Sequence, residues 1–115
     1  MKPQVQFRLR IKRGDVIAIG PGKVGLLEAI ARTGSISAAG RELGMSYRRA
    51  WLLVDEINRS LTSPAVLTAS GGARGGGTSL TATGEELVRR YRAVEDIALA
   101  AAAAELQRLN RLVAP

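Results

Sequence analysis

One segment, residues 35–58, constrains the fold of this chain more than any other. Its first helix can be capped by Ser35 or Ser37 and stops at Gly44, a residue type that accepts backbone angles costly for others. Ser46 can cap a second helix that runs to about Leu61. The apolar residues of this helix follow the i, i+3, i+4, i+7 spacing of a core stripe: Ala50, Leu53, Val54, Ile57 and Leu61. Two short helices around a glycine turn predict a helix-turn-helix.

The residues before this segment predict a hairpin and a helix. Residues 5–12 alternate between apolar and mostly basic side chains, which indicates a strand with one dry face and one basic face. Arg13-Gly14-Asp15 predicts a turn, and Val16 to Ile19 the returning strand, which Gly20-Pro21-Gly22 ends. A helix is expected from Lys23 to Thr33, with Gly34 as its stop and one apolar face made of Leu26, Leu27, Ile30 and Ala31.

A glycine-rich stretch, residues 70–77, lies between two short strand-like runs, Ala65–Ala69 and Thr78–Thr81. A phosphate-binding P-loop is excluded, because that loop ends in Gly-Lys-Ser/Thr and opens a helix. A flexible linker is one interpretation. The other is the wing of a winged helix, in which Arg74 contacts a DNA phosphate or a narrow minor groove. The wing is favoured because strands flank the glycines on both sides.

The end of the chain predicts a long helix, from about Gly84 to about Leu112. Thr83 and Glu86 have the spacing of a capping box. The helix carries more alanine and leucine than one small domain can bury, which favours packing against a second copy of the chain. The alternative is a frayed C-terminal tail.

The expected fold is therefore mainly α with a small amount of β-structure. It is a single winged helix-turn-helix domain over residues 1–115, in which 1–20 form an N-terminal hairpin, 21–82 the helix-turn-helix and wing, and 83–115 a long dimerisation helix. A homodimer would place two recognition helices one DNA turn apart.

Composition narrows the function. Seventeen Lys and Arg against ten Asp and Glu leave a net charge of +7, which favours a polyanionic partner, although basic surfaces also serve solubility. The chain has no His and no Cys, so the commonest general base and metal ligands are missing. We expect no enzyme, no metal and no cofactor. Without an apolar stretch of about 20 residues, we expect no membrane contact and a cytoplasmic location.

Most of the candidate DNA-contacting residues lie around the predicted turn, and the other two, Arg74 and Thr78, lie in and beside the predicted wing. Recognition helices present their N-terminal residues to base edges, where arginine can pair with guanine and aromatic rings can touch thymine methyls. Free N–H groups at capped helix starts favour phosphate. Alternatively, Trp51 is a packing residue and the arginines form a solvated face. The candidates are Ser35, Ser37, Ser46, Tyr47, Arg48, Arg49, Trp51, Arg74 and Thr78.

Four stretches together resemble the DNA-binding domain of the molybdate-responsive, ModE-type regulators, a distant relative of the LysR-type winged helix. They are Gly34-Ser35-Ile36-Ser37-Ala38-Ala39, residues 43–51 (LGMSYRRAW), residues 71–77 (GGARGGG) and Leu80-Thr81-Ala82-Thr83-Gly84. The resemblance covers most of the chain and implies a homodimeric transcription factor that acts on molybdate- or tungstate-related genes.

Full-length members of that family continue into small β-barrel domains that bind molybdate, whereas this sequence ends at Pro115. We therefore expect no molybdate binding by this chain. Two other function classes stay open: a winged-helix module that docks a protein partner, with incidental DNA binding, and an enzyme acting on small anions, which the missing His and Cys disfavour.

Overall fold

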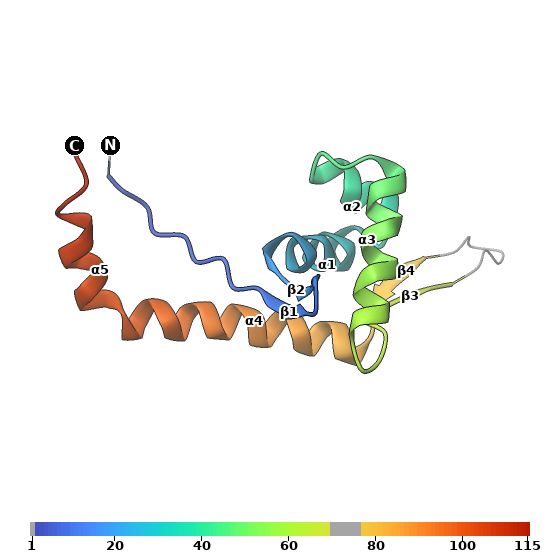
Figure 1. Cartoon of the computed structure of the whole chain (residues 1–115). Helices are drawn as coiled ribbons and strands as arrows, with labels where there is room; N and C mark the ends of the chain where they lie inside the picture. Colours follow the sequence, from blue (N-terminus) through green and yellow to red (C-terminus); the bar gives the residue numbers. More distant parts are fainter. Residues whose placement is uncertain (1, 70–76) are drawn as a thin grey trace.

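The computed structural model describes residues 2–69 and 77–115. In this part of the chain the elements follow the order β1 (Ile11–Arg13), β2 (Val16–Ile19), α1 (Pro21–Thr33), α2 (Ile36–Glu42), α3 (Tyr47–Ser60), β3 (Val66–Thr68), β4 (Thr78–Leu80), α4 (Ala82–Ala101) and α5 (Ala103–Asn110) (Figure 1). The strands form two antiparallel pairs, β1 with β2 and β3 with β4. The expected class, mainly helical with a small amount of β-structure, is confirmed.

The core lies between α1, α2 and α3. α1 contributes Leu26, Leu27, Ala29 and Ile30, all fully buried, and α2 and α3 pack on this face. The predicted stripe of α3 is confirmed, with Ala50, Val54 and Ile57 buried and Leu53 and Leu61 packed at its edge. Ala31 was expected on the apolar face of α1 but is exposed, because it is rotated by about 100° from Ile30, away from the centre of that face.

The boundaries of α1 follow two special residues. The helix begins at Pro21, two residues before the expected start, because proline at the first helical position has no N–H left without a partner. It ends at Gly34, whose φ of 70° lies in the left-handed region and whose N–H donates to the carbonyl of Ile30 at 2.8 Å. The predicted glycine stop is confirmed.

The N-terminal strand is much shorter than expected. Only Ile11–Arg13 pair with β2, and the alternating residues before Ile11 have no strand partner. β2 is four residues long and is followed at once by α1, so no backbone remains for residues 5–10 to bond. Instead this segment runs beside α4 (Figure 1), where the buried Tyr91 hydroxyl donates to the carbonyl of Leu9 at 3.0 Å. Burial raises the pKa of this Tyr91 hydroxyl.

Thr81 caps α4, so the predicted capping box of Thr83 and Glu86 is wrong. The Thr81 hydroxyl accepts the N–H of Gly84 at 3.1 Å and donates to the carbonyl of Pro64 at 2.6 Å. Thr83 lies inside the first turn, and Glu86 forms an ion pair further along the helix. The tertiary bond to Pro64 fixes Thr81 in the extended geometry that a cap requires.

The single long final helix that was expected is divided in two. α4 ends at Ala101, and α5 leaves it in a different direction (Figure 1). Ala102 between them has φ −93° and ψ 3°, outside the regular helical region. Alanine has the highest helix propensity, so the five alanines of residues 100–104 gave no sign of a bend. We refer to residues 94–113 as the C-terminal arm.

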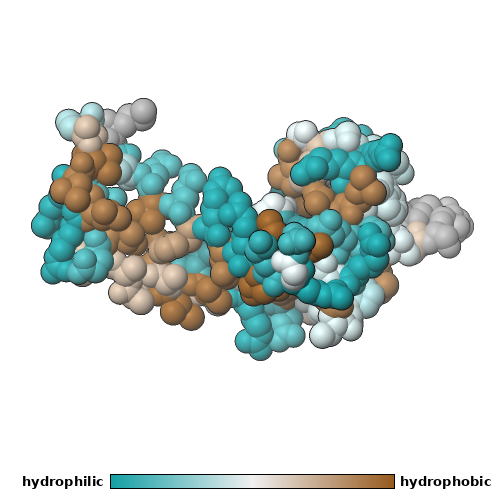
Figure 2. Space-filling view, in the orientation of Figure 1, coloured by the Kyte–Doolittle hydropathy of each residue, from teal (hydrophilic) through white to brown (hydrophobic). Residues whose placement is uncertain are grey.

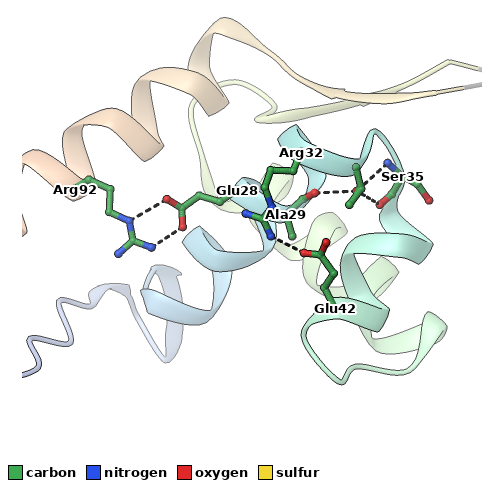
Figure 3. Close-up of polar contacts among 7 residues, drawn as sticks. Glu28, Ala29, Arg32, Ser35, Glu42 and Arg92 are labelled. Carbon is green, nitrogen blue, oxygen red and sulfur yellow. Dashed lines mark hydrogen bonds and ion pairs between the residues drawn. The ribbon is translucent and has the colours of Figure 1, made fainter.

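A forked ion pair fastens α4 to α1. The guanidinium of Arg92 donates to both carboxylate oxygens of Glu28, at 3.0 and 2.5 Å, and to Glu95 at 2.7 Å; Figure 3 shows the pairing with Glu28. The hydrogen bonds from Arg92 lower the pKa of Glu28, and the same bonds to Glu28 and Glu95 raise the pKa of Arg92. The arm is thus held to the helical body at its base.

Candidate nucleic-acid interface

The turn between α2 and α3 is built from a glycine and two serine caps. Ser35 accepts the N–H of Ala38 at 3.1 Å, and Ser46 accepts the N–H of Arg49 at 3.1 Å. Ser35 is therefore the cap of α2, and Ser37 lies half-buried in its first turn. Gly44, with φ 69°, permits the reversal between the two helices.

Gly40 brings the two helices into close contact. A Cβ at this position would lie 2.9 Å from the Cβ of Ala50 on α3, closer than real side chains approach. Ala39 beside it is fully buried, whereas Ala38 is only half-buried. Small residues therefore permit the crossing, as expected, but the closest approach falls on Gly40, which sequence reasoning missed.

Two contacts from α1 fix the orientation of α2 (Figure 3). The Thr33 hydroxyl donates to the carbonyl of Ala29 at 2.8 Å and accepts the N–H of Ser35 at 3.3 Å. Arg32 of α1 pairs with Glu42 at the other end of α2, at 2.5 Å. Both ends of α2 are thus tied to α1, and α2 in turn presents the start of α3.

The start of α3 presents two aromatic side chains at the surface. Tyr47 is 64% exposed and Trp51 40% exposed. Their rings meet edge to face, with centroids 6.1 Å apart. Of the two interpretations of Trp51, packing residue or surface residue, the structure places it outside the core cluster and beside Tyr47.

Arg48 and Arg49 are both exposed in the first turn of α3 but point in different directions. A step of about 100° per residue places Arg48 opposite the buried stripe and Arg49 on its flank. Neither arginine pairs with an acidic residue in the described part of the chain, and the nearest acidic residues in sequence, Glu42 and Asp55, pair with Arg32 and Arg59. Positive charge in a first helical turn opposes the helix dipole, at about 0.3–1 kcal/mol per charge. No stabilising partner in the described residues accounts for these arginines.

Asn58 holds the β3–β4 pair against α3. Its Oδ1 accepts the N–H groups of Ala65 at 2.9 Å and Val66 at 3.1 Å, and its Nδ2 donates to the carbonyl of Val66 at 3.1 Å. Sequence reasoning treated Asn58 only as the end of a segment. A polar residue near the end of a helix, shortly before a turn and a strand, was the available signal.

The second strand of this pair is anchored to α1. The N–H of Thr78 donates to the carbonyl of Gly34 at 3.0 Å, and its side chain is half-buried. β3 and β4 lie in register, with Val66 opposite Leu80 and Thr68 opposite Thr78. Arg74, the residue of the predicted wing expected to contact DNA, and the other residues of 70–76 lie outside the described residues.

Within residues 2–69 and 77–115, no group of three or more His, Cys, Asp or Glu side chains is placed to hold a metal ion. None of the helices described is both long and apolar enough to cross a bilayer.

No family model matches the chain. Individual proteins are similar over about three quarters of its length. The molybdenum-pterin-binding protein MopB of Rhodobacter capsulatus is 52% identical over 91 residues, which cover 75% of this chain and 34% of that protein. The molybdenum transport protein ModE of Azotobacter vinelandii is 42% identical over 78 residues, 68% of this chain and 29% of the relative. The DNA-binding transcriptional dual regulator ModE of Escherichia coli K12 is 35% identical over 88 residues, which cover 76% of this chain and 34% of that protein.

The chain spans about a third of the length of each of these relatives. Their names describe transcriptional regulation, molybdenum transport and molybdenum-pterin binding. The chain is therefore a homologue of the ModE, MopA and MopB proteins over most of its length, which supports its place in a ModE-like family.

Proposed function

We propose that the chain is a sequence-specific, DNA-binding transcriptional regulator with a winged helix-turn-helix, in which α3 enters the major groove and β3–β4 form the wing. One observation carries this proposal: the first turn of α3 exposes Arg48 and Arg49 against the helix dipole, without acidic partners among the described residues. Because these two arginines interact unfavourably with the helix dipole, their presence points to a negatively charged ligand.

The surroundings of these arginines support duplex DNA as that ligand. α2 and the Gly44 turn present the start of α3, and the exposed Tyr47 and Trp51 add apolar edges for thymine methyls or sugars. The Escherichia coli relative is named a DNA-binding transcriptional regulator. The names of the relatives suggest molybdenum-related genes as targets of this chain. The expectation that this chain itself does not bind molybdate stays a prediction.

Replacing Arg48 by alanine is expected to relax base preference. A bidentate arginine–guanine pair contributes about 1–3 kcal/mol of discrimination against the wrong base. The substitution should therefore lower the ratio of specific to nonspecific affinity by roughly 5- to 150-fold. The ratio is measured by fluorescence anisotropy, with a fragment selected from genomic DNA and an unrelated duplex of equal length.

Arg59→Ala is the matched control, because Arg59 is on the same helix but pairs with Asp55 at 2.8 Å. It should leave the ratio unchanged. Wild-type protein that binds every duplex with equal affinity would contradict the proposed specificity, whatever the variants do.

We further propose a homodimer formed through the C-terminal arm. Large apolar side chains are exposed along it, with Ile97 at 67% and Leu112 at 82% exposed, together with Val94, Leu99, Leu109 and Val113. Figure 2 shows apolar surface over the part of the molecule where Figure 1 labels α4 and α5. α5 has no buried residue among those described. Exposed apolar surface on this scale is typical of a protein interface.

The Ile97→Glu variant is expected to be monomeric, because a carboxylate is costly to bury in an apolar interface. Light scattering after size-exclusion chromatography should then give half the mass of the wild type. Ala82→Glu, at the exposed first position of the same helix, should leave the mass unchanged. A wild-type chain that is already monomeric at micromolar concentration would contradict the dimer, and retention of an unrelated protein on the arm would favour a docking module instead.

A further inference from the structure

A second basic surface lies beside α3, apart from its outward face. It is a groove of about 600 Å³ between the N-terminal segment, the β1–β2 turn, the start of α1 and the side of α3. We call it the basic groove. The charged residues that line it are Arg8, Arg10, Asp15, Lys23, Arg49 and Glu56.

Two of these charged residues pair with each other. Lys23 is only 7% exposed, and its Nζ donates to the carbonyl of Ile17 and to the Glu56 carboxylate. The ion pair leaves Lys23 without a free charge for a ligand, although the Glu56 side chain is 44% exposed. Lys23 and Glu56 therefore have a structural role.

The remaining charges leave the groove positive. Arg8, Arg10 and Arg49 are exposed, and none of the three pairs with an acidic residue among those described. Asp15, in the β1–β2 turn, is the acidic side chain of the lining that forms no ion pair among the described residues, since Glu56 pairs with Lys23. Three arginines without acidic partners against one aspartate favour a ligand with several negative charges.

Arg49 connects this groove to the proposed base-contacting face. It follows Arg48 directly, and the helical rotation turns it from that face into the groove. A DNA strand whose bases meet Arg48 has its phosphates on the flanks of α3, and one flank is the groove.

We propose that the basic groove binds phosphates of the DNA backbone through Arg8, Arg10 and Arg49, and that Arg48 alone of the arginine pair contacts bases. This inference rests on the proposed DNA-binding function. It assigns a nucleic-acid contact to the N-terminal segment, and it gives neighbouring arginines different tasks.

The test is a salt titration of DNA affinity by fluorescence anisotropy, with the full chain and two duplexes, one selected and one unrelated. Each lost phosphate contact should flatten the slope of log affinity against log salt by about 0.9. The double variant Arg8→Ala/Arg10→Ala should flatten it by about 2 and Arg49→Ala by about 1, equally for both duplexes. Arg8→Lys/Arg10→Lys keeps the charge and should keep the slope.

Arg89→Ala removes the same charge from an exposed position on α4 and should leave the slope unchanged. If the double variant keeps both the slope and the sequence preference of the wild type, phosphate binding in the basic groove is contradicted. The proposed DNA-binding function is then unaffected. A change of base preference in Arg49→Ala also overturns the division of tasks. If the wild-type protein binds no duplex, both the proposed DNA-binding function and phosphate binding in the basic groove are contradicted.

Discussion

Replacing Gly84 by alanine is expected to lower the free energy of unfolding by about 2–3 kcal/mol. A Cβ on Gly84 would overlap the backbone carbonyl oxygen of Ala65, which precedes β3. A backbone carbonyl cannot swing aside as a long side chain does, so the start of α4 and the β3 strand must separate. The gain of about 1 kcal/mol in helix propensity from glycine to alanine does not offset this overlap.

Gly25→Ala is the matched control for this substitution. Gly25 lies inside α1, and a Cβ there meets no heavy atom within 4 Å. This variant should be more stable than the wild type by about 0.5–1 kcal/mol, from helix propensity alone. Urea denaturation of both variants measures the two changes. A Gly84→Ala protein as stable as the wild type would show that α4 does not pack against β3 as described.

Replacing Asn58 by alanine is expected to cost about 2–3 kcal/mol of stability. The change removes three hydrogen bonds to the backbone of the buried residues Ala65 and Val66. Two N–H groups and one carbonyl then lose their side-chain partner in an apolar environment. Chemical denaturation gives the stability, and amide hydrogen exchange at Ala65 and Val66 should become faster than in the wild type.

Asn58→Asp separates the two functions of this side chain. A carboxylate still accepts both N–H groups, but it cannot donate to the carbonyl of Val66. The aspartate variant should therefore lie between the wild type and the alanine variant in stability, with the exchange of Ala65 and Val66 largely protected. Equal stability of all three proteins would mean that Asn58 does not hold β3 on α3.

Where a local rule decides the structure, sequence reasoning was accurate. Gly34 and Gly44 terminate helices because the left-handed backbone they adopt is costly for other residues. Ser46 caps α3, because its side chain satisfies an N–H that the helix leaves free. The spacing of Ala50, Val54 and Ile57 identified the buried face of α3 for the same local reason.

Where a distant partner decides the structure, sequence reasoning failed. The alternating residues 5–10 are not a strand, because β2 is too short to pair with them. Thr81 caps α4 in place of Thr83, because Pro64 holds Thr81 in the required position. Sequence reasoning also missed the bend at Ala102, because the surrounding run of good helix formers gives no local signal of it.

The same distinction between local and tertiary causes applies to the candidate interface. The sequence by itself determined that α3 begins with two arginines and two aromatic residues after a glycine turn, because caps, turns and periodicity act over a few residues. Only the tertiary structure decided that Arg49 lines a groove which Arg48 does not line, that Asn58 fastens β3 to α3, and that Arg8 and Arg10 share that groove with Arg49. Such pairings depend on how separate elements pack, and residues about 40 positions apart carry no shared pattern along the chain.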